Sequence, residues 1–136
     1  MGDADIRISF EEGGNWSYIG TASQPVPQDK ATMNFGGLQN GVEPQKIVQA
    51  ILHEFGHALG CVHEHQRPDV NISWEEERVH EHYAKSKWSK EMVESNILKP
   101  YCSAQLSCSE YDKALIMHYP YPATLTKDGS SQAENF

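Results

Sequence analysis

The chain has 136 residues, which is the size of a single domain, so we predict one domain spanning residues 1–136. Hydrophobic residues make up 38% and charged residues 22%, a composition typical of a globular chain with its own core. The formal net charge of −8 argues against nucleic acid or an anionic membrane as the partner. No stretch approaches the roughly 18 apolar residues of a membrane span.

The first third of the chain predicts a small sheet. Three short strands are expected, at residues 5–10, 16–21 and 31–35. In the first, polar and apolar residues alternate, so that Ile6, Ile8 and Phe10 would face one side of a half-buried strand. The turn signal Gly13-Gly14-Asn15 separates the first two strands.

A helix is predicted next, from about Pro44 to Gly60. Proline suits the first turn of a helix, and glycine is common directly after its end. Between them, apolar residues recur at a spacing of four and predict a buried stripe: Ile47, Ile51, Phe55 and Leu59.

Two further helices are predicted in the second half. Ser73, with Glu76 three residues later, resembles a capping box for a helix over about 74–87. Ser89 would cap a short helix ending near Ile97. Residues 100–136 contain scattered proline, glycine and cysteine, and we expect them to be mostly irregular.

Histidine, with seven residues, is unusually frequent, and its arrangement carries the chemistry. The segment that begins at His53 fits the pattern H-E-x-x-H-x-x-G-x-x-H. On a helix, His53 and His57 project from one face, so two imidazoles can reach one zinc ion at about 2.0–2.1 Å. Glu54 leaves the helix in another direction and can serve as a general base beside the metal.

The rest of the pattern completes a catalytic rather than a structural zinc site. Gly60 can adopt a left-handed conformation and end the helix sharply. The returning chain then brings His63 to the metal as a third ligand, and three protein ligands leave one position open for water. Five fixed positions make a chance match rare, at roughly 10⁻⁵ to 10⁻⁴ per chain of this length.

The long motif is that of the metzincin zinc endopeptidases, which the chain resembles. A Met-turn would be formed by residues 115–119, Leu-Ile-Met-His-Tyr, whose methionine lies 54 residues after the third histidine. The Met-His-Tyr triplet, Glu64 and the Arg-Pro-Asp of residues 67–69 are most similar to the astacin branch. Residues 5–20 and 32–36 resemble compact microbial members that combine astacin-like and matrix-metalloproteinase-like features.

The resemblance implies an α+β fold, a metzincin-like zincin. A small twisted mixed sheet would pack on the zinc-binding helix, and a mostly irregular C-terminal subdomain would carry the Met-turn. His53, His57 and His63 would bind one zinc ion, and Glu54 would activate the attacking water. Met117 would form an apolar floor under the histidines without binding the metal.

Three further roles follow from the resemblance. Tyr119 matches the astacin tyrosine that approaches zinc and stabilises the oxyanion. Thr32–Phe35 would be the edge strand that pairs with an extended substrate. In astacins the glutamate at the position of Glu64 pairs with the mature N-terminus, and the N-terminus of this chain does not resemble theirs.

The remaining histidines and cysteines have simpler interpretations. We expect His65, His80, His82 and His118 to be ordinary polar residues rather than ligands. Cys61 lies inside the motif, but three histidines already fill the spacing, so we expect it in the core. Cys102 and Cys108 are close enough to close a small disulfide loop, or all three thiols are free.

The predicted function is a zinc-dependent endopeptidase that acts on proteins or peptides as a monomer. Two alternatives are a zinc-binding scaffold without catalysis and a zinc amidase acting on non-protein substrates. The stretch from Tyr119 to Leu125 would line the pocket for the residue after the scissile bond. Its Tyr-Pro-Tyr-Pro-Ala-Thr-Leu sequence suggests an aromatic or aliphatic rim.

The ends of the chain bear on its origin. Met1–Asp5 has no basic region and no apolar run, so it is not a signal peptide, and either the protein is cytosolic or its leader is missing. Two glycosylation sequons, at Asn15 and Asn71, favour secretion, which we expect. Metzincins generally continue to a C-terminal helix after the Met-turn, so a chain ending at Phe136 is expected to be truncated.

Overall fold

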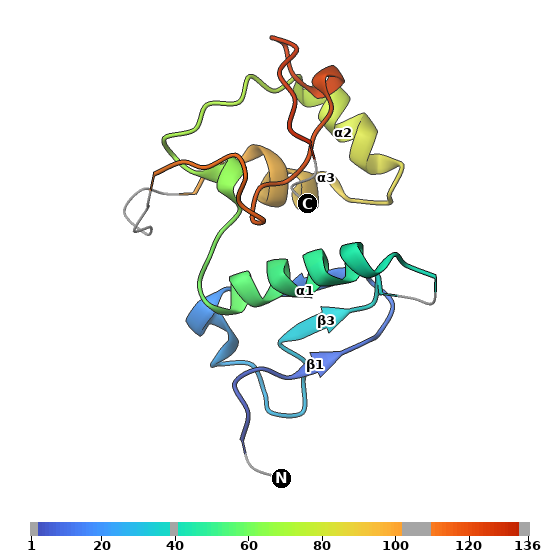
Figure 1. Ribbon diagram of the computed structural model, residues 1–136, viewed down its shortest axis with the longest axis vertical. Coiled ribbons are helices and arrows are strands. Elements are labelled where there is room, and N and C mark those ends of the chain that lie inside the picture. The colour runs from blue at the N-terminus through green and yellow to red at the C-terminus, as the bar shows by residue number, and fades with distance from the viewer. Residues whose placement is uncertain (1–2, 39–40, 102–109, 134–136) are drawn as a thin grey trace. The chain divides into compact units, whose positions relative to one another are not determined.

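The structure is a computed structural model that describes residues 3–38, 41–101 and 110–133. The chain divides into two compact units at the junction between Val62 and His63. The first unit contains the strands and the long helix α1, and the second contains the helices α2 and α3 (Figure 1). Among the described residues, no helix is both long and apolar enough to cross a membrane.

The first unit contains a mixed three-stranded sheet. Its strands are β1 (Ile8–Ser9), β2 (Asn15–Ser17) and β3 (Met33–Phe35). The strand order is β1-β3-β2, with β1 parallel and β2 antiparallel to β3. The small mixed sheet is therefore as predicted, although each strand is shorter than the sequence pattern indicated.

The side chain of Asn34 holds the turn between β1 and β2 against the middle strand. It is almost completely buried, with 1% of its surface exposed. Its Oδ1 accepts hydrogen bonds from Ser9 Oγ at 2.7 Å and Glu11 N at 2.9 Å, and its Nδ2 donates to Glu11 O and Gly14 O. One buried amide thus satisfies backbone groups that the short strands leave unpaired.

The prediction that Thr32–Phe35 is an edge strand is wrong. Since β3 is hydrogen-bonded to β1 on one side and to β2 on the other, it is the central strand and cannot accept a further strand. Its three residues are all buried. A short run ended by glycines has the same appearance in sequence whether it is central or at an edge, so the pattern could not distinguish the two.

The apolar face predicted for the first strand is also not buried. Ile6, Ile8 and Phe10 are 40%, 46% and 74% exposed. The strand is held instead through the opposite side of the alternation, where Ser9 bonds to Asn34 and Arg7 donates to three backbone carbonyls. Polar and apolar residues therefore alternate as predicted, but the polar side chains, and not the apolar ones, hold this segment to the rest of the unit.

Helix α1 (Pro44–Ala58) matches the prediction closely, with proline in its first turn. It lies against β2 and β3 (Figure 1). Gly60 has φ +99°, the left-handed conformation expected of the residue that ends the helix. The predicted buried stripe is wrong: Ile51, Phe55 and Leu59 are 37%, 36% and 85% exposed, and Ile47 is only half-buried.

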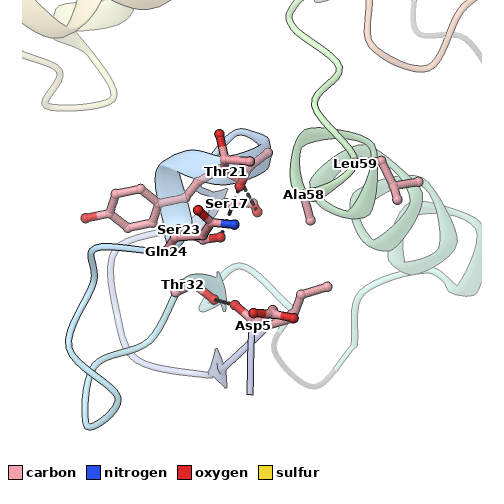
Figure 2. A pocket seen from close by; sticks show the side chains of 11 residues that line it. Asp5, Ser17, Thr21, Ser23, Gln24, Thr32, Ala58 and Leu59 are labelled. Atoms are coloured by element: carbon pink, nitrogen blue, oxygen red, sulfur yellow. Dashed lines mark hydrogen bonds between the residues drawn. The ribbon is translucent and has the colours of Figure 1, made fainter. Parts of the chain in front are cut away.

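A pocket of about 380 Å³ lies in the first unit, between the 3₁₀ helix η1 (Gly20–Ser23) and the C-terminal end of α1. Figure 2 shows Thr21 and Ser23 of η1 on one side of it and Ala58 and Leu59 on the other. Its described lining includes none of the histidines of the motif. Nothing in the sequence pattern indicates this pocket.

The second unit is built on short helices: η2 (Glu64–Gln66), α2 (Glu76–Ala84), α3 (Lys90–Val93), the π-helical turn η3 (Glu94–Leu98) and η5 (Ala123–Leu125). Its core consists of Val79, Val93, Ile97, Tyr121 and Leu125. Beyond residue 110, the described chain has isolated bridges and one short helix, which agrees with a mostly irregular C-terminal part.

The two predicted helix caps have different outcomes. Ser89 caps α3 as expected, because its Oγ accepts a hydrogen bond from Met92 N at 3.2 Å. The capping box at Ser73 is wrong, since α2 has Glu75 as its N-cap and no side-chain cap bond. Ser73 is instead engaged through its carbonyl, which accepts from Lys127 N at 2.7 Å.

Cys61 is a free, exposed cysteine, so the expectation of a core position is wrong. It directly follows the left-handed turn at Gly60, where the chain leaves the helix and its packing. The predicted alternatives for Cys102 and Cys108, a disulfide loop or free thiols, lie outside the described residues.

Candidate metal centre

The first two histidines of the motif lie one turn apart on α1, as their spacing requires. The ring centroids of His53 and His57 are 4.8 Å apart and the rings are perpendicular. His57 is buried, and its Nδ1 lies 2.8 Å from the carbonyl oxygen of Cys61. Because a carbonyl only accepts hydrogen bonds, Nδ1 carries the proton and Nε2 is the nitrogen available to a metal.

His63 follows the left-handed turn at Gly60, within one continuous segment of eleven residues, 53–63. The potential ligand atoms of His53, His57 and His63 all lie within 4.8 Å of one another. Three imidazoles in this arrangement match the donor set of a catalytic zinc ion. The cluster therefore fits the metal that the motif predicts.

Glu54 is a buried carboxyl that follows His53 on α1. Its side chain is 5% exposed, and its Oε2 has no hydrogen-bond partner among the described residues. Burial raises the pKa of this carboxyl from 4.5 to about 7. An unpartnered buried carboxylate oxygen is costly unless a substrate, water or proton meets it, which supports a chemical role.

Burial also affects His57, whose pKa is lowered because its charged form is desolvated. The hydrogen bond to Cys61 and the neighbouring His53 act in opposite directions on this shift. A lowered pKa keeps the imidazole neutral, which is the form that binds a metal.

Met117 and Tyr119, the predicted Met-turn residues, belong to the second unit together with His63. Met117 is 5% exposed, and its carbonyl accepts a hydrogen bond from Glu64 N at 3.0 Å. The ring of Tyr119 meets that of His63 edge to face, with centroids 4.6 Å apart. Tyr119 of the segment 115–119 thus contacts the third histidine.

Glu64 takes part in a buried charge network within the second unit. Its Oε1 accepts hydrogen bonds from Arg67 Nη1 at 3.0 Å and from Asp112 N at 3.2 Å. Arg67, only 4% exposed, also forms two bonds to Asp69, at 2.9 and 2.8 Å, which lower the pKa of that carboxyl. These contacts lock the chain directly after the third histidine.

Gln66 is a site residue that sequence reasoning missed. It is one of the most completely buried side chains, and its Oε1 lies 3.0 Å from His63 Nδ1. Its Nε2 donates to the carbonyls of Ser95 and Lys99, both at 2.8 Å. In the sequence, only the position of this polar residue, three after His63, hinted at the contact. Its other two partners, Ser95 and Lys99, lie too far along the chain for a sequence pattern to connect them with Gln66.

Three of the remaining histidines, His65, His80 and His118, form contacts with other groups, and His82 is exposed on α2. His65 Nε2 lies 3.1 Å from the carbonyl of Asn96, and His118 Nε2 lies 2.9 Å from the hydroxyl of Tyr111. His80 pairs with Glu94 at 3.1 Å. Within the described part of the chain, the histidine cluster of the motif is the group close enough to hold a metal ion.

Comparison with known proteins agrees with this geometry. The model of the astacin family of peptidases matches residues 2–132. The chain is 33% identical over 122 residues to Protein SpAN of Strongylocentrotus purpuratus. It is 31% identical over 123 residues to Blastula protease 10 of Paracentrotus lividus. Each alignment covers 82% of this chain and 16% of the relative, so the chain spans about one sixth of those proteins.

Solved structures give the same result for the fold. A structure of myroilysin matches with a TM-score of 0.92 and 38% identity, covering 99% of this chain and 67% of that chain. A crystal structure of myroilysin matches with a TM-score of 0.64 and 37% identity, covering 99% of this chain and 60% of that chain. The fold and the histidine cluster are those of a metzincin. Within that class, the chain belongs to the astacin family.

Proposed function

We propose that this protein is a zinc-dependent endopeptidase, a single catalytic domain over residues 1–136. The observation that carries the proposal is the cluster of three histidines, whose ligand atoms lie within 4.8 Å of one another. The buried Glu54 follows the first of them, and its Oε2 has no hydrogen-bond partner among the described residues. Membership of a peptidase family supports the reaction type. An intact Glu54 argues against a scaffold that binds zinc without catalysis.

His53, His57 and His63 would hold one zinc ion, which when bound supplies Lewis-acid activation of water and of the scissile carbonyl. Glu54 would take the proton from the attacking water at Oε2 and return it to the leaving amine. In the metal-free chain, burial raises the pKa of this carboxyl to about 7, and a bound zinc ion would favour its ionised, basic form. The hydroxyl of Tyr119 would donate a hydrogen bond to the developing oxyanion.

An extended substrate would add to an outer strand of the sheet, since the central strand β3 is already paired on both sides. Strand β2 suits this role because it is antiparallel, exposed at Asn15 and Trp16, and lies against the helix that carries His53 and His57. Backbone hydrogen bonds to the strand would give binding that is largely independent of substrate sequence.

A hollow in the second unit supports the expectation that residues 119–125 line a pocket for a substrate side chain. It has a volume of about 510 Å³ and is lined by residues 120–123 and 131–133. Pro120, Pro122 and Ala123 make this lining largely apolar. We therefore propose a preference for a hydrophobic residue after the scissile bond, in a secreted, monomeric enzyme acting on proteins and peptides.

The proposal is tested by cleavage of a denatured protein substrate before and after metal removal. Activity should be lost when the chain is treated with a chelator and should return when one equivalent of zinc is added. As a matched pair, H57A should lose both zinc and activity, while H82A, on an exposed position of α2, should keep both. Stoichiometric zinc in H57A would contradict the ligand assignment.

A further inference from the structure

We propose that Gln66 is a positioning residue that fixes the tautomer and ring orientation of His63, so that Nε2 of this histidine is presented to the metal. This inference rests on the proposed function, because it takes His63 to be a ligand. It is carried by hydrogen bonds that lie entirely within the second unit. Gln66 would act through His63 rather than by touching metal or substrate.

The orientation of the Gln66 amide follows from its partners. Its Nε2 end lies 2.8 Å from two backbone carbonyls, those of Ser95 and Lys99. Carbonyl oxygens only accept hydrogen bonds, so this end must be the NH₂ group, which has two hydrogens to donate. The opposite end, which faces His63, is therefore the amide oxygen.

The protonation of His63 follows in turn. The amide oxygen of Gln66 lies 3.0 Å from His63 Nδ1 and has no hydrogen to donate. For this contact to be a hydrogen bond, Nδ1 must carry the proton. A neutral imidazole protonated on Nδ1 has its free lone pair on Nε2, which is the form that binds a metal through Nε2.

The π-helical turn η3 makes this arrangement possible. In an α-helix, the amide of Lys99 would donate to the carbonyl of Ser95, four residues earlier. Here Lys99 N donates instead to Glu94 O, five residues earlier, at 2.8 Å. The wider turn leaves the Ser95 carbonyl available to Gln66, which agrees with the frequent occurrence of such turns at functional sites.

His57 is also protonated on Nδ1, but its hydrogen-bond acceptor is a backbone carbonyl and not a side chain. Its Nδ1 donates to the backbone carbonyl of Cys61 at 2.8 Å, a group that no side-chain substitution at that position removes. The corresponding acceptor for His63 is the side chain of Gln66, so it can be removed by mutation. The chain thus offers a direct test of how much a ligand-orienting hydrogen bond contributes to this site.

The test uses the full chain and compares Q66M with T126V. Methionine keeps the length of glutamine but accepts no strong hydrogen bond from Nδ1 and donates none to the carbonyls. Thr126 is a matched control, because it is buried in the same unit and its Oγ1 lies within hydrogen-bond distance of two carbonyls, those of Ala123 and Ser130. Both variants lose buried hydrogen bonding, but only Q66M changes the partner of His63.

Two measurements separate positioning from stability. The ¹⁵N shifts of the His63 ring in the metal-free chain should show a proton on Nδ1 in the wild type and in T126V, and a shift toward the other tautomer in Q66M. Zinc affinity, measured by competition with a chelator, should fall about 10- to 100-fold in Q66M. It should stay within about threefold of wild type in T126V, even if both variants melt at lower temperatures.

The proposal is overturned if wild-type His63 carries its proton on Nε2, or if Q66M binds zinc as tightly as T126V. The first criterion needs no variant, so it decides the matter even if Q66M does not fold. Failure of the proposed function would look different. In that case the wild-type chain would bind no zinc, while the tautomer of His63 in the metal-free chain would still be as stated.

Discussion

Replacing Glu54 with glutamine should stabilise the metal-free protein at alkaline pH. Burial raises the pKa of Glu54 from 4.5 to about 7, so the folded chain holds this proton more tightly than the unfolded chain does. As pH rises from 4.5 through 7, the unfolded state loses its proton first, and the stability of the folded state falls. A difference of this size between the two pKa values corresponds to about 3 kcal/mol at pH 8.

Glutamine has nearly the same shape and never carries the charge. The E54Q variant should therefore equal the wild type in stability near pH 4.5 and exceed it by about 3 kcal/mol at pH 8. Urea unfolding of both chains in the presence of a chelator, at several pH values between 4.5 and 8.5, measures this difference. The E77Q variant, altered at an exposed glutamate of α2, controls for the loss of a surface carboxylate.

An E54Q variant that is less stable than the wild type at pH 8 would contradict this prediction. A difference that did not change with pH would refute it equally, because it would show that the Glu54 carboxyl titrates alike in the folded and unfolded chains. The expected gain in stability accompanies an expected loss of hydrolysis. Such opposition between stability and activity is common where a site holds a group in an unfavourable environment.

Three further substitutions test other parts of the account. R67M should lower the free energy of unfolding by about 3–5 kcal/mol in urea titrations, because it leaves the buried carboxylate of Glu64 without its cation. In G60A the added Cβ would meet no atom of the described residues within 4 Å, so the φ of +99° is what opposes it, and thermal unfolding should show a loss of about 1–2 kcal/mol. Y119F should keep the ring contact with His63 and bind zinc normally, but lower kcat about 10²-fold with little change in KM.

Each of these three has an outcome that would contradict it. A loss of less than about 1 kcal/mol in R67M would mean that the pair with Glu64 is not desolvated. An unchanged melting temperature in G60A would mean that the turn before the third histidine is not constrained. Wild-type kcat in Y119F would remove the tyrosine hydroxyl from the proposed mechanism.

The parts of the site that sequence could predict are those set by local spacing. His53, His57 and Glu54 lie on one helix, whose geometry converts a spacing of four residues into a shared face. Gly60 then ends that helix in the left-handed conformation that glycine permits. Because all of this occurs within a few turns of chain, the motif predicted the cluster without knowledge of the rest of the fold.

The parts that could not be predicted depend on long-range pairing. The central position of β3 is decided by which strands lie on either side of it, and its own residues do not record this. Gln66 is similar, since its carbonyl partners Ser95 and Lys99 are 29 and 33 residues away. The π-helical turn that frees one of those carbonyls has no recognised sequence signature, so nothing in the sequence connected Gln66 to His63.

Hydrolysis of internal peptide bonds by Glu54 and the histidine cluster, as proposed, can be measured in one assay. A diverse mixture of unstructured peptides is incubated with the zinc-loaded wild-type chain and with E54Q, and the products are identified by mass spectrometry. We expect internal cuts from the wild type, enriched in hydrophobic residues after the cleaved bond, and almost none from E54Q, with both chains holding one zinc ion. A zinc-loaded wild type that makes no internal cuts, or an E54Q variant that cuts as fast, would contradict the account.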